Sequence, residues 1–122
     1  MAGKSSPNAP VLKPRLRVTC GDEIAIGPGK MELLALLVET GSLNEAASRL
    51  DMSYMRAWTL MKTMNACFRE PVMVAERGGK AGGGMKVTPM GHRVLTLYMQ
   101  MEAGALKAAA APWRDLKKLL RA

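Results

Sequence analysis

The side chains that could perform catalysis or bind a metal are few and scattered along the chain. His92 is the sole histidine and has no nearby cluster of cysteines or carboxylates, so we predict no metal site. Cys20 and Cys67 lie far apart and lack a Cys-x-x-Cys spacing, which is typical of a reduced protein and not of a disulfide scaffold. The acidic residues form no convergent pair that the sequence can establish. We therefore predict no enzyme activity, no catalytic residue and no cofactor.

Two compositional features also have simpler interpretations than a ligand site. The glycine-rich run from Gly78 to Gly84 lacks the GxxxxGK[ST] spacing of a phosphate-binding loop and is not followed directly by a helix. The chain has 11 methionines, but Met61 and Met64 lie on an apolar helical stripe, where methionine fills gaps in a core poor in aromatic residues. We expect neither a nucleotide site nor a copper site.

A different chemistry is suggested by the residues from Ser53 to Lys62. Ser53, Tyr54 and Thr59 can hydrogen-bond to base edges or phosphates, and Lys62 can neutralise a phosphate. Further along, basic side chains lie within and beside the glycine-rich run: Arg77, Lys80 and Lys86. The formal net charge of +8 and the pI near 9.9 favour an anionic partner, most commonly nucleic acid. Charge alone does not separate this partner from a membrane surface, or from a role in solubility.

Two consecutive helices are predicted to position these residues. Gly41 is expected to end one helix, and Ser42 and Glu45 form a capping box, in which each side chain satisfies a free backbone N–H. The short helix that follows carries Leu43, Ala46, Ala47 and Leu50 on one face, and Asp51-Met52 is expected to make a tight turn. Ser53 then caps a helix from Tyr54 to about Phe68, whose apolar face is Ala57, Met61, Met64 and Phe68. This is a helix-turn-helix pattern, and its second helix has Ser53, Tyr54, Met55, Trp58, Thr59 and Lys62 pointing away from the core.

The flanking segments complete a winged arrangement. Leu16–Thr19 and Ile24–Ile26 are predicted to form a hairpin, and a helix begins at Pro28 with Met31, Leu33, Leu34, Leu37 and Val38 as its apolar residues. Val72–Ala75 and Met85–Val87 are predicted as strands around the glycine-rich run. Thr88-Pro89 starts a long helix with Val94, Leu97, Tyr98, Met101 and Ala105 on one face, and a last helical segment is expected from Trp113 to Leu120. Because Leu95, Met99 and Leu106 lie off that face, the long helix is expected to have more than one packing partner.

We divide the 122 residues into a disordered lead-in (1–14), a winged domain with its dimerisation helices (15–110) and a basic amphipathic tail (111–122). The tail is expected to be a docking helix or a solvated end, and a membrane-surface role is the weaker alternative. The first residues have no apolar stretch typical of a signal peptide, and no apolar run approaches the length that spans a bilayer. We therefore predict a cytoplasmic protein.

Several strings in the sequence resemble the N-terminal domain of ModE-type molybdate-responsive regulators. They are Glu39-Thr40-Gly41-Ser42-Leu43-Asn44-Glu45-Ala46-Ala47, Met52-Ser53-Tyr54-Met55-Arg56-Ala57-Trp58, the glycine-rich run, and Thr88-Pro89-Met90-Gly91. The first string is shared with LysR-type regulators, whereas the second and third are more specific. The resemblance covers about Leu16 to Tyr98.

The resemblance implies which residues contact DNA and how the chain assembles. It assigns DNA contacts to Ser53, Tyr54, Arg56 and Lys62 on the second helix and to Arg77, Lys80 and Lys86 on the wing, and dimerisation to the helices that flank the winged domain. Met55 stands where the family commonly has a basic residue, a departure that bears on base preference. Only Glu102 to Ala122 follow the resembling part, too few for the oxyanion-binding β-barrel of two-domain members. The resemblance thus implies DNA binding without direct molybdate sensing, in a single-domain member.

Together these observations predict a mainly α protein with a small β wing, a winged helix-turn-helix with a long C-terminal helix. The expected function is that of a homodimeric, sequence-specific regulator that binds double-stranded DNA, with no small-molecule effector evident. Two alternatives remain open: a DNA-binding architectural protein indifferent to sequence, and a winged domain used for protein–protein interaction. Trp58 is expected either at the boundary with DNA or beneath the wing.

Overall fold

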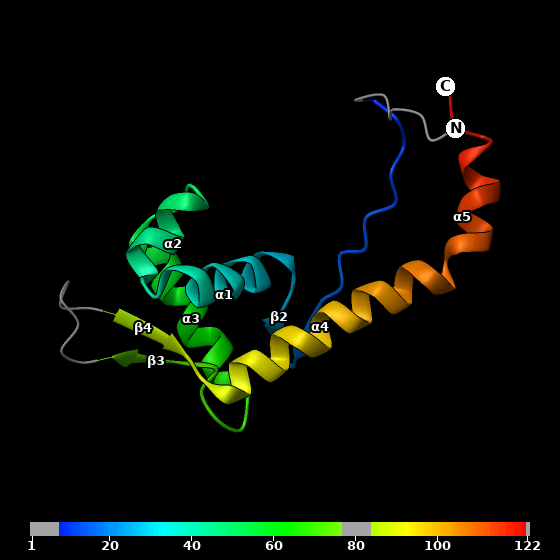
Figure 1. Ribbon diagram of the computed structural model, residues 1–122. Helices are drawn as coiled ribbons and strands as arrows, with labels where there is room; N and C mark the ends of the chain where they lie inside the picture. Colours follow the sequence, from blue (N-terminus) through cyan, green and yellow to red (C-terminus); the bar gives the residue numbers. More distant parts are fainter. Residues whose placement is uncertain (1–7, 77–83, 122) are drawn as a thin grey trace.

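The fold is that of a computed structural model, which describes residues 8–76 and 84–121. Within these ranges the chain forms five helices and two small antiparallel sheets (Figure 1). In chain order they are β1 (Val18–Cys20), β2 (Glu23–Ile26), α1 (Pro28–Thr40), α2 (Leu43–Arg49), α3 (Tyr54–Cys67), β3 (Met73–Glu76), β4 (Gly84–Val87), α4 (Pro89–Ala108) and α5 (Ala110–Lys117). None of the helices in the described ranges is long and apolar enough to cross a membrane.

The core forms where α1, α2 and α3 meet. The predicted apolar stripe of α1 is confirmed at Met31, Leu33, Leu34 and Leu37, which are 0 to 5% exposed, whereas Val38 is 47% exposed and lies outside the core. The small side chains of α2 allow α3 to cross close by. The buried residues contributed by these two helices are Leu43, Ala46, Ala47, Ala57, Met61 and Met64.

The turn between α2 and α3 orients α3. Asp51 adopts a left-handed backbone conformation with φ of 58°, and the Met52 N–H donates to the Ala47 carbonyl at 3.0 Å. Aspartate tolerates this conformation better than most residues because its short polar side chain can bond locally. The predicted tight turn at Asp51-Met52 is therefore confirmed.

The β3–β4 hairpin packs against α1 through β4 and leads into α4. Its strands pair from Met73 with Val87 to Glu76 with Gly84. We predicted that β3 begins at Val72, but the Val72 N–H donates to the Asn65 side chain at 2.8 Å and its carbonyl accepts from the Thr88 N–H at 3.0 Å. Since both polar groups of Val72 bond outside the ladder, the strand begins one residue later.

The helix α4 extends away from the body, and α5 follows at its far end (Figure 1). Only Gly91, Val94 and Tyr98 of α4 are buried, whereas Leu97 and Met101, which belong to the predicted apolar face, are exposed. The helix α5 begins at Ala110 and not after Pro112. Pro112 is its third residue, where a helix has no internal partner for an N–H and proline is tolerated.

A hydrogen bond joins the segment before β1 to α4. Residues 8–17 form no helix or strand, and the Tyr98 hydroxyl donates to the Leu16 carbonyl at 2.8 Å. The first strand is Val18–Cys20 in place of the predicted Leu16–Thr19, with a register irregularity between Val18 and Thr19. This hairpin contacts α3 and the start of α1 through β2.

Candidate nucleic-acid interface

The start of α3 is fixed by Ser53. Its hydroxyl oxygen accepts a hydrogen bond from the Arg56 N–H at 3.1 Å, as predicted for an N-cap. The helix has no acidic residue along its whole length, and its charged side chains are Arg56 and Lys62. An exposed face of α3 thus carries no negative charge that would repel an anionic partner.

Three of the predicted contact residues form one exposed row on α3. Met55, Thr59 and Lys62 follow each other at helical spacing, and all three are exposed. The Thr59 hydroxyl donates to the Met55 carbonyl at 3.0 Å, which leaves its oxygen free to accept a hydrogen bond. Tyr54, 47% exposed, lies at the beginning of the same helix.

The other two predicted residues of α3 lie on its flanks. Arg56 shares a row with Leu60 and Thr63, and all three line a cavity bounded also by the β1–β2 hairpin and the start of α1. Trp58 lies on the opposite flank of α3, in the same row as Asn65, and is half-buried against the core. This is the side on which Asn65 bonds to β3, so Trp58 lies on the hairpin side of the helix.

The β3–β4 hairpin is docked against the beginning of α2. The Met85 N–H donates to the Gly41 carbonyl at 3.0 Å, and Ser42 forms an isolated β-bridge with Gly84. Lys86 is exposed on β4. The other basic residues predicted for the wing, Arg77 and Lys80, lie outside the described residues.

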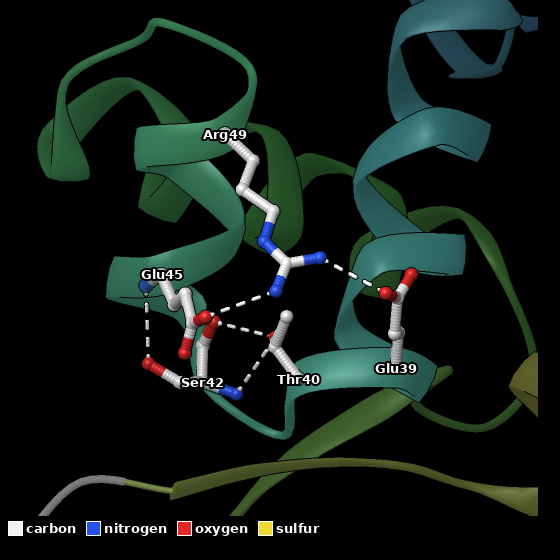
Figure 2. Close-up of polar contacts among 5 residues, drawn as sticks. All are labelled: Glu39, Thr40, Ser42, Glu45 and Arg49. Carbon is white, nitrogen blue, oxygen red and sulfur yellow. Dashed lines mark hydrogen bonds and ion pairs between the residues drawn. The ribbon is translucent and has the colours of Figure 1, made fainter.

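Figure 2 shows a polar cluster that joins α1 to α2. Arg49 bonds to Glu39 at 2.9 Å and to Glu45 at 3.1 Å, and the bond to Glu39 is the main reason why the pKa of Arg49 is raised. One half of the predicted capping box is present, because the Ser42 hydroxyl oxygen accepts a hydrogen bond from the Glu45 N–H at 3.1 Å. The other half is wrong, because the Ser42 N–H donates to Thr40 Oγ1 at 3.2 Å and not to the Glu45 side chain. Both carboxylates bond to Arg49, so its charge is already compensated within the fold.

The structure also reveals polar residues that the sequence analysis missed. The Asn65 amide bonds to the backbone of Val72 and Met73, and no pattern along the chain indicates a bond of that span. Cys20 and Cys67 are free thiols that interact with each other. Partial burial raises the pKa of Cys67, and the nearby Cys20 raises it further. Across the described residues, no group of three or more histidine, cysteine or acidic side chains could hold a metal ion.

Comparison with known proteins relates this chain to molybdenum-associated proteins and regulators. No family model matches the chain. The molybdenum-pterin-binding protein MopB of Rhodobacter capsulatus is 40% identical over 82 residues, 67% of this chain and 30% of that protein. The transcriptional regulator ModE of Haemophilus influenzae is 33% identical over 87 residues, 71% of this chain and 34% of that protein. The DNA-binding transcriptional dual regulator ModE of Escherichia coli is 32% identical over 71 residues, 58% of this chain and 27% of that protein.

These relatives are regulators and molybdenum-associated proteins by name, and none of the three is named as an enzyme. The chain spans about a third or less of the length of the curated relatives that it matches. The expectation that no small-molecule effector is evident is opposed by relatives whose names include molybdenum-pterin binding.

Proposed function

We propose that this chain is a transcriptional regulator that binds double-stranded DNA in a sequence-specific manner through a winged helix-turn-helix. In this proposal α2 and α3 form the helix-turn-helix, and the β3–β4 hairpin is the wing. The observation that carries the proposal is the exposed row of Met55, Thr59 and Lys62 on a helix without acidic residues. The names of the relatives, one of them a DNA-binding regulator, support it.

Each predicted residue has a role in this proposal. Lys62 neutralises a phosphate, Tyr54 and Thr59 contact base edges in the major groove, and Met55 makes apolar contact there. Ser53 keeps one hydroxyl hydrogen to donate to a phosphate while it caps the helix. Trp58 supports the helix from the hairpin side, and Arg56 acts at the opposite flank. Lys86, with Arg77 and Lys80, contacts the backbone through the wing.

We further propose that the active form is a homodimer, acting in the cytoplasm, that pairs through α4 and α5. Large apolar side chains are exposed on both helices and directly after α5: Leu97, Met99, Met101, Leu106, Leu116, Leu119 and Leu120. Such a surface is unusual for a monomer and suits pairing with a second copy. Two-fold symmetry would then place two α3 helices in major grooves about 34 Å apart, or a multiple of that distance.

The role of α3 is tested by measuring binding of a mixed-sequence duplex over a series of salt concentrations. Lys62→Ala should weaken binding to all duplexes and lower the salt slope by about 1, because one phosphate contact is lost. Lys13→Ala, which changes an exposed lysine before β1, is the matched control and should leave the slope unchanged. Equal effects of both substitutions would show that binding depends on net charge alone, as in an architectural protein. Absence of any duplex binding at low salt would favour the protein-interaction alternative.

A further inference from the structure

A cavity of about 500 Å³ lies on the flank of α3 that faces away from the β3–β4 hairpin. It is bounded by the segment before β1, the β1–β2 hairpin, the first turn of α1 and the row of α3 that holds Arg56. Four cationic side chains line it, one or two from each of three segments: Arg15, Arg17, Lys30 and Arg56. Asp22 and Glu23 line it too, so positive charges exceed negative ones.

Within the part of the chain that the structure describes, no carboxylate forms an ion pair with the cationic side chains of this cavity. The ion pairs found among the described residues are those of Arg49, at a different place in the fold. Lys30 is the least expected of the four, because it is only 8% exposed. Its ammonium donates to the Ile24 carbonyl, which satisfies one of its three N–H groups but compensates no charge. A lysine that is almost fully buried is ordinarily paired with an anion.

The first turn of α1 also has no side-chain cap. Its N-cap residue is Gly27, which supplies no side-chain cap, and no acidic residue occupies the first turn. The third position holds Lys30, a cation at the positive end of the helix dipole, which is electrostatically unfavourable. Arg17 lies directly over this end, since a Cβ built on Gly27 would be 3.3 Å from its Cγ.

From these observations we infer that the cavity binds one tetrahedral oxyanion of the phosphate or sulfate class. Its charge would compensate Lys30 and the three arginines, whose guanidinium groups can each offer two parallel N–H donors. The free N–H groups at the start of α1 supply further donors. The bound oxyanion has one of two sources. It is a free inorganic anion, or it is a phosphate of a DNA strand that passes the Arg56 flank of α3. The second source rests on the proposed function, whereas the first does not.

The first experiment titrates the full chain with sodium sulfate, inorganic phosphate or sodium molybdate and follows backbone amide signals by NMR. Sodium chloride at equal ionic strength is the reference. A free-oxyanion site predicts saturable shifts of the Gly29 and Lys30 amides with the tetrahedral anions only. The double variant Arg15→Ala/Arg17→Ala should bind about tenfold more weakly, because charge-assisted hydrogen bonds are lost. Both arginines are exposed, so the fold should persist, and Lys13→Ala/Arg69→Ala, which changes two exposed cations outside the cavity and outside α4 and α5, is the charge-matched control.

The second experiment measures the salt dependence of duplex binding for the same variants. If the anion is a DNA phosphate, Arg15→Ala/Arg17→Ala should lower the salt slope by about 0.9 relative to the control variant, even where free anions produce no shifts. Absence of anion shifts together with an unchanged slope would overturn the site. If the unmodified chain binds no duplex, the proposed function fails and the sulfate titration still decides whether the cavity binds an oxyanion.

Discussion

Among the glycines that the structure describes, Gly91 has the least space for a side chain. A Cβ at this position would lie 2.1 Å from the Val72 carbonyl oxygen and 2.7 Å from Val87 Cγ1, so α4 can approach the hairpin only with glycine there. We expect Gly91→Ala to lower the free energy of unfolding by about 1–3 kcal/mol, as overpacking usually does. On the same helix, Gly104 has no atom within 4 Å of its Cβ position. Gly104→Ala should raise stability by up to about 1 kcal/mol. Urea unfolding measures the free energy of unfolding of both variants. Equal effects of Gly91→Ala and Gly104→Ala would contradict the close contact at Gly91.

The two cysteines should differ in reactivity. Cys20 is exposed, whereas Cys67 is partly buried and its pKa is raised. Because the thiolate is the nucleophile, a raised pKa leaves Cys67 less thiolate near pH 8, and its alkylation should be slower. The difference should narrow as the pH rises above the pKa of Cys67. Mass spectrometry after timed treatment with iodoacetamide measures both rates, and faster modification of Cys67 near pH 8 would refute this prediction.

Asn65 joins the β3–β4 hairpin to α3. Its amide accepts from the Val72 N–H at 2.8 Å and donates to the Met73 carbonyl at 3.0 Å. Asn65→Ala should leave these groups unpaired and cost about 1–3 kcal/mol of stability. Hydrogen exchange should accelerate at the Val72 amide more than at amides in the centre of α1. Asn44→Ala, which changes an exposed asparagine on α2, is the control and should alter neither the stability nor the exchange rate of the Val72 amide. Unchanged exchange in Asn65→Ala would show that the ladder alone holds the hairpin.

The helices were predictable because their signals are local. Ser53, Thr88 and Pro28 mark the beginnings of α3, α4 and α1 where the sequence placed them, since caps and prolines act within one turn. Two errors arose where a residue bonds to a partner other than the predicted one. Glu45 bonds to Arg49 and not to the Ser42 N–H, and Val72 bonds to Asn65 and not to a strand.

The shape of the molecule implies a partner for α4. Met99 and Leu106 are 63% and 41% exposed and lie on one row of the helix. If they pair with a second copy, Met99→Glu/Leu106→Glu should shift the chain from dimer to monomer, because buried unpaired charges are costly at an interface. Analytical ultracentrifugation measures the oligomeric state of each variant. Val38→Glu, on an exposed position of α1, should leave a dimer intact. A monomer before any substitution would contradict the homodimer.

The α3 row could be predicted from the sequence, whereas the cationic cavity could not, because its residues come from distant segments. The row on α3 followed from helical spacing, but Arg15, Arg17 and Lys30 surround Arg56 only because the β1–β2 hairpin packs beside α3. Likewise helical spacing predicted an apolar face on α4, but Leu97 and Met101 on that face are exposed. Periodicity indicates which face is apolar and does not indicate whether the same chain or a second copy buries it.

Selection of bound duplexes from a random pool, at near-physiological salt and followed by sequencing, tests the central claim most directly. A dimeric sequence-specific regulator predicts recovery of a palindrome whose half-sites lie about one helical turn, or a multiple of it, apart. The same selection with Tyr54→Ala or Thr59→Ala should recover an altered motif, because these side chains are proposed to contact bases. Recovery of duplexes without any enriched motif, or of no duplex at all, would contradict the account.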